Sequence, residues 1–272
     1  MSIKIPEEII QLLSMPGGHS LIIRGLPGTG KTTLALQIVE ELSSEANSFY
    51  LSTRVPDKAL FTYFPWLEDR IKVGNILRAK RTINDENKST TTIESINDTK
   101  KDRPAKVPRV ELSKLESRIE ESDEFMVPMT KGDVAYQYEI GSIFPELEMI
   151  YDIVERALPE RMIVVVDSIE GLQEKYDVDV GRLIFTLQQD LVLGADANII
   201  FVTETAEQKL DYLGDGIIDL KFSLDNGYII RTLSVLKLRG VPIYKPLYLF
   251  TLSNGRFQVI PDFHVSEQMC SS

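Results

Sequence analysis

The fold is decided by the stretch Gly25-Leu26-Pro27-Gly28-Thr29-Gly30-Lys31-Thr32, which lies between the apolar run 21–23 and a helix-forming run that begins at Thr33. This is a complete G-x-x-x-x-G-K-T pattern, and a strand before it with a helix after it is the context in which the pattern binds phosphate. Glycines allow the tight turn that directs amide N–H groups at a phosphate, and the positive end of the next helix adds to the attraction. A strand-loop-helix corner with chance glycines is the alternative, which the complete pattern disfavours. The sequence therefore predicts a nucleoside triphosphate site.

The pattern also assigns individual contacts. We expect nine consecutive residues to bind the nucleotide: Gly25, Leu26, Pro27, Gly28, Thr29, Gly30, Lys31, Thr32 and Thr33. Lys31 is placed to reach the β- and γ-phosphates, and the Thr32 hydroxyl is placed to hold Mg²⁺.

A second metal contact is expected from the apolar run 161–168, which predicts a buried parallel strand that ends in a carboxylate. Asp167 is the acid in that position, and we expect it to bind to the magnesium shell. A strand-terminal aspartate can also be only a cap or turn residue. The complete phosphate loop elsewhere in the chain favours the metal role for Asp167.

Composition limits the class of protein. The chain has 272 residues and a formal net charge of −11, which disfavours a general affinity for nucleic acid. Its single cysteine, Cys270, excludes an intramolecular disulfide framework and fits a reducing compartment. No apolar run approaches the roughly 18 residues that span a bilayer, and the N-terminal residues lack a basic-then-apolar signal pattern. We expect a soluble cytoplasmic protein without membrane contact.

The order of predicted elements indicates an α/β fold. Helices are expected at 6–13, 33–44, 57–64, 146–158 and 180–193, the last ended by Gly194, and strands at 21–23, 48–53, 161–168 and 198–203. The runs 216–222, 228–237, 247–251 and 256–260 predict an antiparallel meander with hairpin turns at Asp225-Asn226-Gly227 and Ser253-Asn254-Gly255. We expect one domain, 1–272, whose mostly parallel central sheet is flanked by helices and followed by this meander.

Residues 80–132 differ from the rest because they are polar, turn-rich and poor in large apolar side chains. Such a segment buries too little surface to offset its ordering entropy, so we expect a mobile insertion, with a short helix at 110–119. Its first part is basic and its second part acidic, which fits either a partner surface or, more commonly, solvated charge. Residues 262–272 are expected to form a tail.

Several segments carry a resemblance to known ATPases. The phosphate loop together with Ile163-Val164-Val165-Val166-Asp167-Ser168-Ile169 resembles the RecA superfamily. Tyr212-Leu213-Gly214-Asp215-Gly216-Ile217-Ile218 and Lys237-Leu238-Arg239-Gly240 are similar to the "aDGVI" and "KMRG" segments of KaiC-like ATPases. A closer resemblance, through the stretches 23–33 and 50–55, is to the archaeal gas-vesicle regulatory protein D (GvpD-like) P-loop group.

The resemblance implies a RecA-like P-loop fold that binds ATP and Mg²⁺ and assembles into rings or filaments with ATP at subunit boundaries. Lys237 and Arg239 would then reach the γ-phosphate of a neighbouring subunit, as a cation clamp on developing phosphoryl charge. A basic pair on a strand is otherwise commonly solvent-facing, and this alternative stays open.

One departure from the family concerns the catalytic base. KaiC-like enzymes carry a pair of glutamates after the second strand, whereas the matching residues here are Thr53 and Arg54. Neither side chain can act as a carboxylate base at neutral pH. Glu170 or Glu204 could substitute. Thr203-Glu204 lies at the sheet edge, where it could sense the γ-phosphate or, equally, cap the segment that follows. We therefore expect slow hydrolysis.

Three functional hypotheses follow. The first is a weak Mg-dependent ATPase with a regulatory role, and the second is an ATP-gated switch or scaffold that barely hydrolyses ATP and holds a transcriptional or signalling partner. The third is a DNA-binding recombinase paralogue, which the acidic balance and the lack of an aromatic-basic stripe disfavour.

Overall fold

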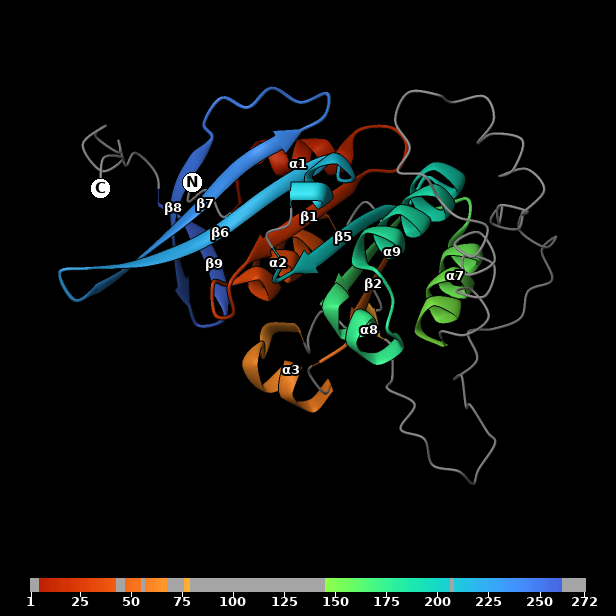
Figure 1. Ribbon diagram of the computed structural model, residues 1–272, viewed down its shortest axis with the longest axis horizontal. Helices are drawn as coiled ribbons and strands as arrows, with labels where there is room; N and C mark the ends of the chain where they lie inside the picture. Colours follow the sequence, from red (N-terminus) through yellow and green to blue (C-terminus); the bar gives the residue numbers. More distant parts are fainter. Residues whose placement is uncertain are drawn as a thin grey trace.

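A nine-stranded sheet organises the computed structural model, which describes residues 5–42, 47–54, 57–67, 76–78, 145–205 and 208–260. The strands are β1 Ser20–Gly25, β2 Asn47–Ser52, β3 Ile76–Arg78, β4 Met162–Asp167, β5 Asn198–Thr203, β6 Gly216–Asp225, β7 Tyr228–Leu238, β8 Leu247–Ser253 and β9 Arg256–Val259. Their order is β3-β2-β4-β5-β1-β6-β7-β8-β9, and Figure 1 labels these strands except β3 and β4. The first six strands in that order are parallel, and β7, β8 and β9 are antiparallel. The predicted mostly parallel sheet with a C-terminal meander is confirmed.

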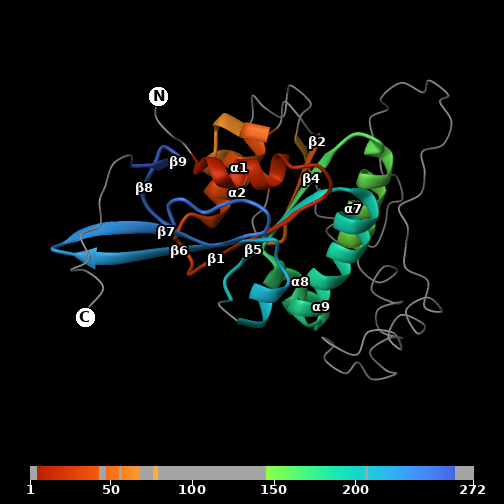
Figure 2. The same ribbon diagram turned by 90° about the horizontal axis from the view of Figure 1, so that it is seen from above.

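Helices cover both faces of the parallel part. Those described are α1 Glu7–Ser14, α2 Lys31–Leu42, α3 Asp57–Tyr63, α7 Pro145–Ala157, α8 Ile169–Tyr176 and α9 Val180–Leu187, with η1 Gln188–Leu193 and η2 Gln208–Tyr212. Figure 2 shows α1 and α2 on one face and α8 and α9 on the other. Successive residues of β5 alternate between the two cores, Ile200 toward α1 and α2 and Phe201 toward α8 and α9. The buried strands therefore need apolar residues at every position.

The register of the parallel strands brings four strand ends to one edge of the sheet. Gly25 at the end of β1 pairs with Leu220 of β6, and Asp167 at the end of β4 pairs with both Ser52 of β2 and Val202 of β5. Ligands of open α/β sheets bind beyond the carboxyl ends of the strands. The residues that follow these strand ends are therefore the candidates for a site.

Both predicted hairpin turns are confirmed. Asn226 and Gly227 have φ angles of 48° and 82°, and Asn254 and Gly255 have 51° and 68°. Two consecutive positive φ angles are what a two-residue hairpin turn with asparagine and glycine requires. The first turn joins β6 to β7 in a hairpin that extends beyond the helices (Figures 1 and 2).

Other local expectations need correction or lie outside the described residues. The helical run from Val180 reaches Leu193 as expected, with Gly194 at its C-cap in a right-handed conformation (φ −87°), whereas the left-handed φ of 52° is found at Asp196. Its second half, η1, is a π-helix. Helix α8 and strand β3 were not expected. The insertion 80–132, its helix 110–119 and the tail 262–272 fall outside the described residues.

Helix α8 was not predicted from the sequence because a glycine, which disfavours a helix, stands in its first turn. A Cβ on Gly171 would lie 2.2 Å from the Thr53 hydroxyl oxygen, so this position needs glycine for the close approach of β2 and α8.

Within the described ranges, no helix is long and apolar enough to cross a membrane.

Gln37 fastens α2 to the edge strand β9. Its buried amide donates to the Phe257 carbonyl (2.8 Å) and accepts from the Phe257 N–H (2.9 Å). Edge strands have unpaired backbone groups, and this side chain satisfies two of them.

We predict that Gln37→Leu lowers the free energy of unfolding by about 2–4 kcal/mol, because the N–H and C=O of Phe257 lose their partner in a buried place. Urea unfolding followed by circular dichroism measures the change. Gln11→Leu, the same exchange at an exposed position of α1, should change it by less than about 0.5 kcal/mol. Equal effects of the two substitutions would contradict the role of Gln37.

Candidate functional site

The loop between β1 and α2 has the backbone of a phosphate cradle. Gly28 and Gly30 adopt positive φ angles of 81° and 103°, which strongly favour glycine, and a Cβ on Gly28 would meet open space. Gly25 lies against β6, since a Cβ there would stand 2.4 Å from the Leu220 carbonyl oxygen. The Thr29 hydroxyl closes the loop by donating to the Leu26 carbonyl oxygen at 2.8 Å. The loop is thus held against the sheet, with room above Gly28.

Lys31 is the cation of this loop. Its ammonium donates to the carbonyl oxygens of Gly25 (2.6 Å) and Leu26 (3.1 Å), so it lies curled over the loop. Burial lowers the pKa of Lys31, and the nearby carboxylates of Glu204 and then Asp167 oppose that shift. The ammonium therefore stands in a field of acidic groups.

The predicted pair for magnesium is brought together. The Thr32 hydroxyl donates to Asp167 Oδ2 at 2.6 Å, and the Tyr50 hydroxyl donates to the same oxygen at 2.6 Å. Protein atoms surround the carboxylate closely, although the residue keeps some solvent contact at the strand end. Burial raises the pKa of Asp167, and the two hydrogen bonds partly offset this. A hydroxyl and a carboxylate oxygen in contact fit the hard oxygen ligands that Mg²⁺ prefers.

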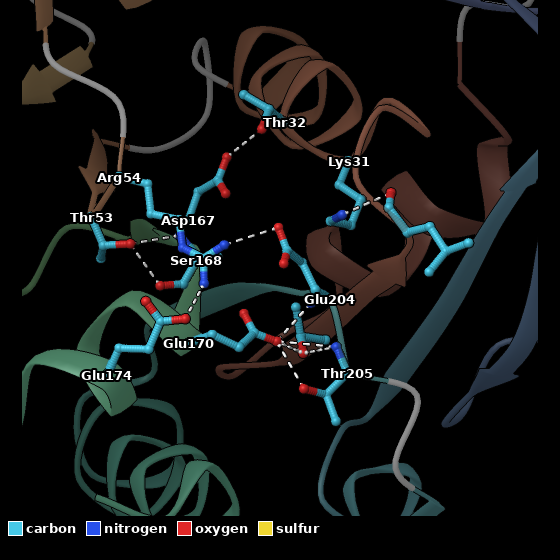
Figure 3. A network of polar contacts seen from close by, with 12 residues as sticks. Lys31, Thr32, Thr53, Arg54, Asp167, Ser168, Glu170, Glu174, Glu204 and Thr205 are labelled. Carbon is cyan, nitrogen blue, oxygen red and sulfur yellow. Dashed lines mark hydrogen bonds and ion pairs between the residues drawn. The ribbon is translucent and has the colours of Figure 1, made fainter. Parts of the chain in front are cut away.

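Thr53 and Arg54, the residues at the expected glutamate positions, have different tasks. The Thr53 hydroxyl donates to the Ser168 carbonyl oxygen (2.8 Å) and accepts from the Ser168 N–H (2.9 Å), so it ties the end of β2 to the end of β4. The Arg54 guanidinium instead pairs with Glu174 of α8 (2.7 Å) and with Glu204 after β5 (3.1 Å) (Figure 3). Of the two residues only Arg54 carries a charge, and its guanidinium contacts the carboxylates of Glu174 and Glu204.

Glu170 binds the backbone that follows β5. Its Oε1 accepts from the Thr203 hydroxyl, the Glu204 N–H (2.6 Å) and both the N–H and hydroxyl of Thr205 (3.1 Å each). The side chain is buried, and Oε2 has no hydrogen-bond partner among the described residues. Burial favours a higher pKa for Glu170, but these donors outweigh it and lower the pKa. The carboxylate stays ionised and holds the loop in place.

Lys237 and Arg239 lie away from this edge. The register pairs Lys237 with Ile217, near the start of β6, whereas the phosphate loop follows the pairing of Gly25 with Leu220. The Lys237 ammonium donates to the Asp211 carbonyl oxygen (2.9 Å), and Arg239 pairs with Asp215 (2.7 Å) while remaining largely exposed. The structure does not bring either side chain to the loop of its own chain.

The geometry thus collects Lys31, Thr32, Asp167, Glu204 and Glu170 from four segments. Sequence reasoning missed Tyr50 and Glu174, which hold Asp167 and Arg54. A signal existed for Tyr50, because it lies in the predicted strand that should neighbour the strand of Asp167. Glu174 carried none, since α8 was not predicted.

Comparison with known proteins agrees with the resemblance seen in the sequence. Residues 9–236 match the family described as "GvpD gas vesicle protein, P-loop domain". Protein GvpD1 of Halobacterium salinarum is 29% identical over 262 residues, which cover 94% of this chain and 40% of that protein. Protein GvpD2 of the same organism is 28% identical over 267 residues, 96% of this chain and 45% of that protein. The chain spans less than half the length of either relative.

Among solved structures, the KaiC-like protein PH0186 from Pyrococcus horikoshii has a similar fold. The TM-score is 0.57 with 16% sequence identity, and the match covers 91% of each chain. At this identity the likeness establishes the fold alone, which is that of a KaiC-like protein of RecA type.

We predict that Asp167→Asn increases the free energy of unfolding of the ligand-free protein at pH 7 by on the order of 1 kcal/mol. A raised pKa means that the ionised carboxylate destabilises the fold above that pKa, and protonation removes this cost as the pH falls. The difference between variant and wild type should therefore shrink between pH 7 and about pH 4.

Urea titrations at several pH values measure this difference. The matched control is Asp179→Asn, because hydrogen bonds and Lys209 outweigh burial at Asp179 and lower its pKa. That variant should not be more stable than wild type at pH 7. A less stable Asp167→Asn protein at pH 7 would contradict the burial cost that we infer.

Proposed function

This chain belongs to the GvpD gas vesicle protein P-loop domain family, and on that premise we propose that it is a magnesium-dependent ATP-binding protein of KaiC/RecA type with slow ATP hydrolysis and a regulatory role. The observation that carries the proposal is the contact between Thr32 and Asp167 beside the Lys31 loop. This contact lies at the edge where the strands end and at the N-terminus of α2, both of which favour phosphate binding.

The residues divide the work of binding. Backbone N–H groups of the loop and the Lys31 ammonium would hold the phosphates, and the carbonyl oxygens that now bind Lys31 are neutral partners that a phosphate outcompetes. Thr32 and Asp167 would hold magnesium, with Tyr50 keeping the carboxylate in place. Bound magnesium neutralises phosphate charge during phosphoryl transfer.

Slow hydrolysis follows from the lack of a well-placed base. Thr53 and Arg54 offer no carboxylate, and Glu170 uses one oxygen to hold the loop after β5. Glu204 is a carboxylate at the edge of the site, but it is paired with Arg54. These contacts also favour the second candidate function, in which ATP is bound and barely cleaved and its occupancy controls a transcriptional or signalling partner.

A homo-oligomer completes the proposal. Lys237, near the end of β7, and Arg239, just after it, lie away from their own loop, and Arg239 is mostly exposed, so a neighbouring subunit could reach them. We infer that they would contact ATP across a subunit boundary.

We predict that ATP with Mg²⁺, at about one hundred times its dissociation constant, stabilises the fold by about 2.7 kcal/mol. This corresponds to a melting shift of roughly 5–10 °C for a domain of this size. Lys31→Ala should abolish the shift, whereas Lys175→Ala on α8, where the lysine is exposed, should retain it. Differential scanning calorimetry measures both. The proposal fails if wild type shows no shift or if Lys31→Ala shows the same one.

For the subunit boundary, we predict that ATP turnover per subunit rises with protein concentration and falls to background in Arg239→Ala, since an arginine supplied in trans is worth about 10³–10⁵ in rate. Mixing Arg239→Ala with Lys31→Ala should restore turnover, because each supplies what the other lacks. Phosphate release is the readout. Turnover that ignores concentration, or a mixture that stays inactive beside an active wild type, contradicts a site shared between subunits.

A further inference from the structure

The carboxylate of Glu204 lies between two cations. On one side it pairs with the Arg54 guanidinium at 3.1 Å, and on the other it is the strongest electrostatic partner of the Lys31 ammonium (Figure 3). Lys31 comes from the phosphate loop and Arg54 from the end of β2, so the two cations belong to separate segments. An anion between them is the arrangement that a phosphate group would also adopt.

The pairing of Arg54 and Glu204 is easily exchanged. Their side chains are 37% and 33% exposed, and ion pairs at such exposure contribute little to stability. A terminal phosphate carries more negative charge than a carboxylate and offers several oxygens to the planar fork of a guanidinium. The phosphate therefore competes well for Arg54.

The surroundings allow the exchange without a backbone change. Glu170 holds the N–H groups of Glu204 and Thr205, so the Glu204 side chain can turn away while its backbone stays fixed. Glu174 of α8 pairs with the Arg54 guanidinium at 2.7 Å, but its side chain is 69% exposed, so this pair also lets the guanidinium turn toward a phosphate.

We propose that Arg54 is the residue by which this chain distinguishes a nucleoside triphosphate from a diphosphate, and that the terminal phosphate displaces Glu204 from it. The proposal rests on the proposed function, since it requires nucleotide at the Lys31 loop. It adds a specificity residue at a position that matches a glutamate of KaiC-like enzymes. A diphosphate ends short of Arg54 and leaves the pair with Glu204 intact.

Isothermal titration calorimetry of the full chain with Mg²⁺ tests this, using ADP and the non-hydrolysable triphosphate adenylyl imidodiphosphate. Arg54→Ala should weaken the triphosphate about 10- to 100-fold, as the loss of a charged hydrogen-bonding partner does, and change ADP by less than about twofold. Glu204→Gln should strengthen the triphosphate by about 3- to 10-fold and ADP by less, because the lost charge neighbours both Lys31 and Arg54 and only the triphosphate reaches Arg54.

Two controls complete the experiment. Arg156→Ala removes an exposed arginine at the far end of α7 and should leave both affinities unchanged. Arg54→Lys keeps the charge but loses the fork, and should fall between wild type and Arg54→Ala. Melting temperatures show that each variant is folded.

The outcomes separate the two proposals. If wild type binds neither nucleotide, or if Lys31→Ala binds both as well as wild type, the proposed function fails. If wild type binds both but Arg54→Ala changes them equally or not at all, only the role of Arg54 fails. A Glu204→Gln variant with unchanged triphosphate affinity and lost turnover would assign Glu204 to catalysis and overturn its role as a competing anion.

Discussion

The parallel register of β2, β4, β5 and β1 is the constraint on which the site depends. It fixes Ser52 beside Asp167 and Asp167 beside Val202, so residues from distant parts of the sequence emerge at one edge. The two apolar cores on either side of the sheet hold that register. If a strand slipped by one residue, the side chains that pack in one core would point into the other. The geometry of the polar groups at the edge is therefore set by burial elsewhere.

The electrostatics of the edge follow from this convergence. Two cations, Lys31 and Arg54, stand among the carboxylates of Asp167, Glu170, Glu174 and Glu204. The carboxylates are held in three ways. Hydroxyls bind Asp167, backbone and hydroxyl groups bind Glu170, and the Arg54 guanidinium pairs with both Glu174 and Glu204. Burial lowers the pKa of Lys31 and raises that of Asp167, so both charged forms are costly without a ligand. Under the proposed function, nucleotide and magnesium would supply the opposite charges.

An arginine where a carboxylate base was expected changes what the site does well. A guanidinium binds phosphate through several donors but cannot accept a proton at neutral pH. Under the proposed function, the site would be better suited to holding ATP than to cleaving it.

The sequence alone determined the phosphate loop, the buried strand ending in Asp167 and both hairpin turns, because each depends on local patterns: glycine spacing, a continuous apolar run, and asparagine followed by glycine. It also determined the α/β class, through the alternation of those patterns. Only the tertiary structure decided that Thr53 faces Ser168 while Arg54 meets Glu204 and Glu174, that Tyr50 binds Asp167, and that Lys237 and Arg239 lie away from their own loop. These facts depend on strand order and register, which arise from packing between segments far apart in the chain. Local patterns do not encode them, although Tyr50 lies in a predicted strand that should neighbour the strand of Asp167.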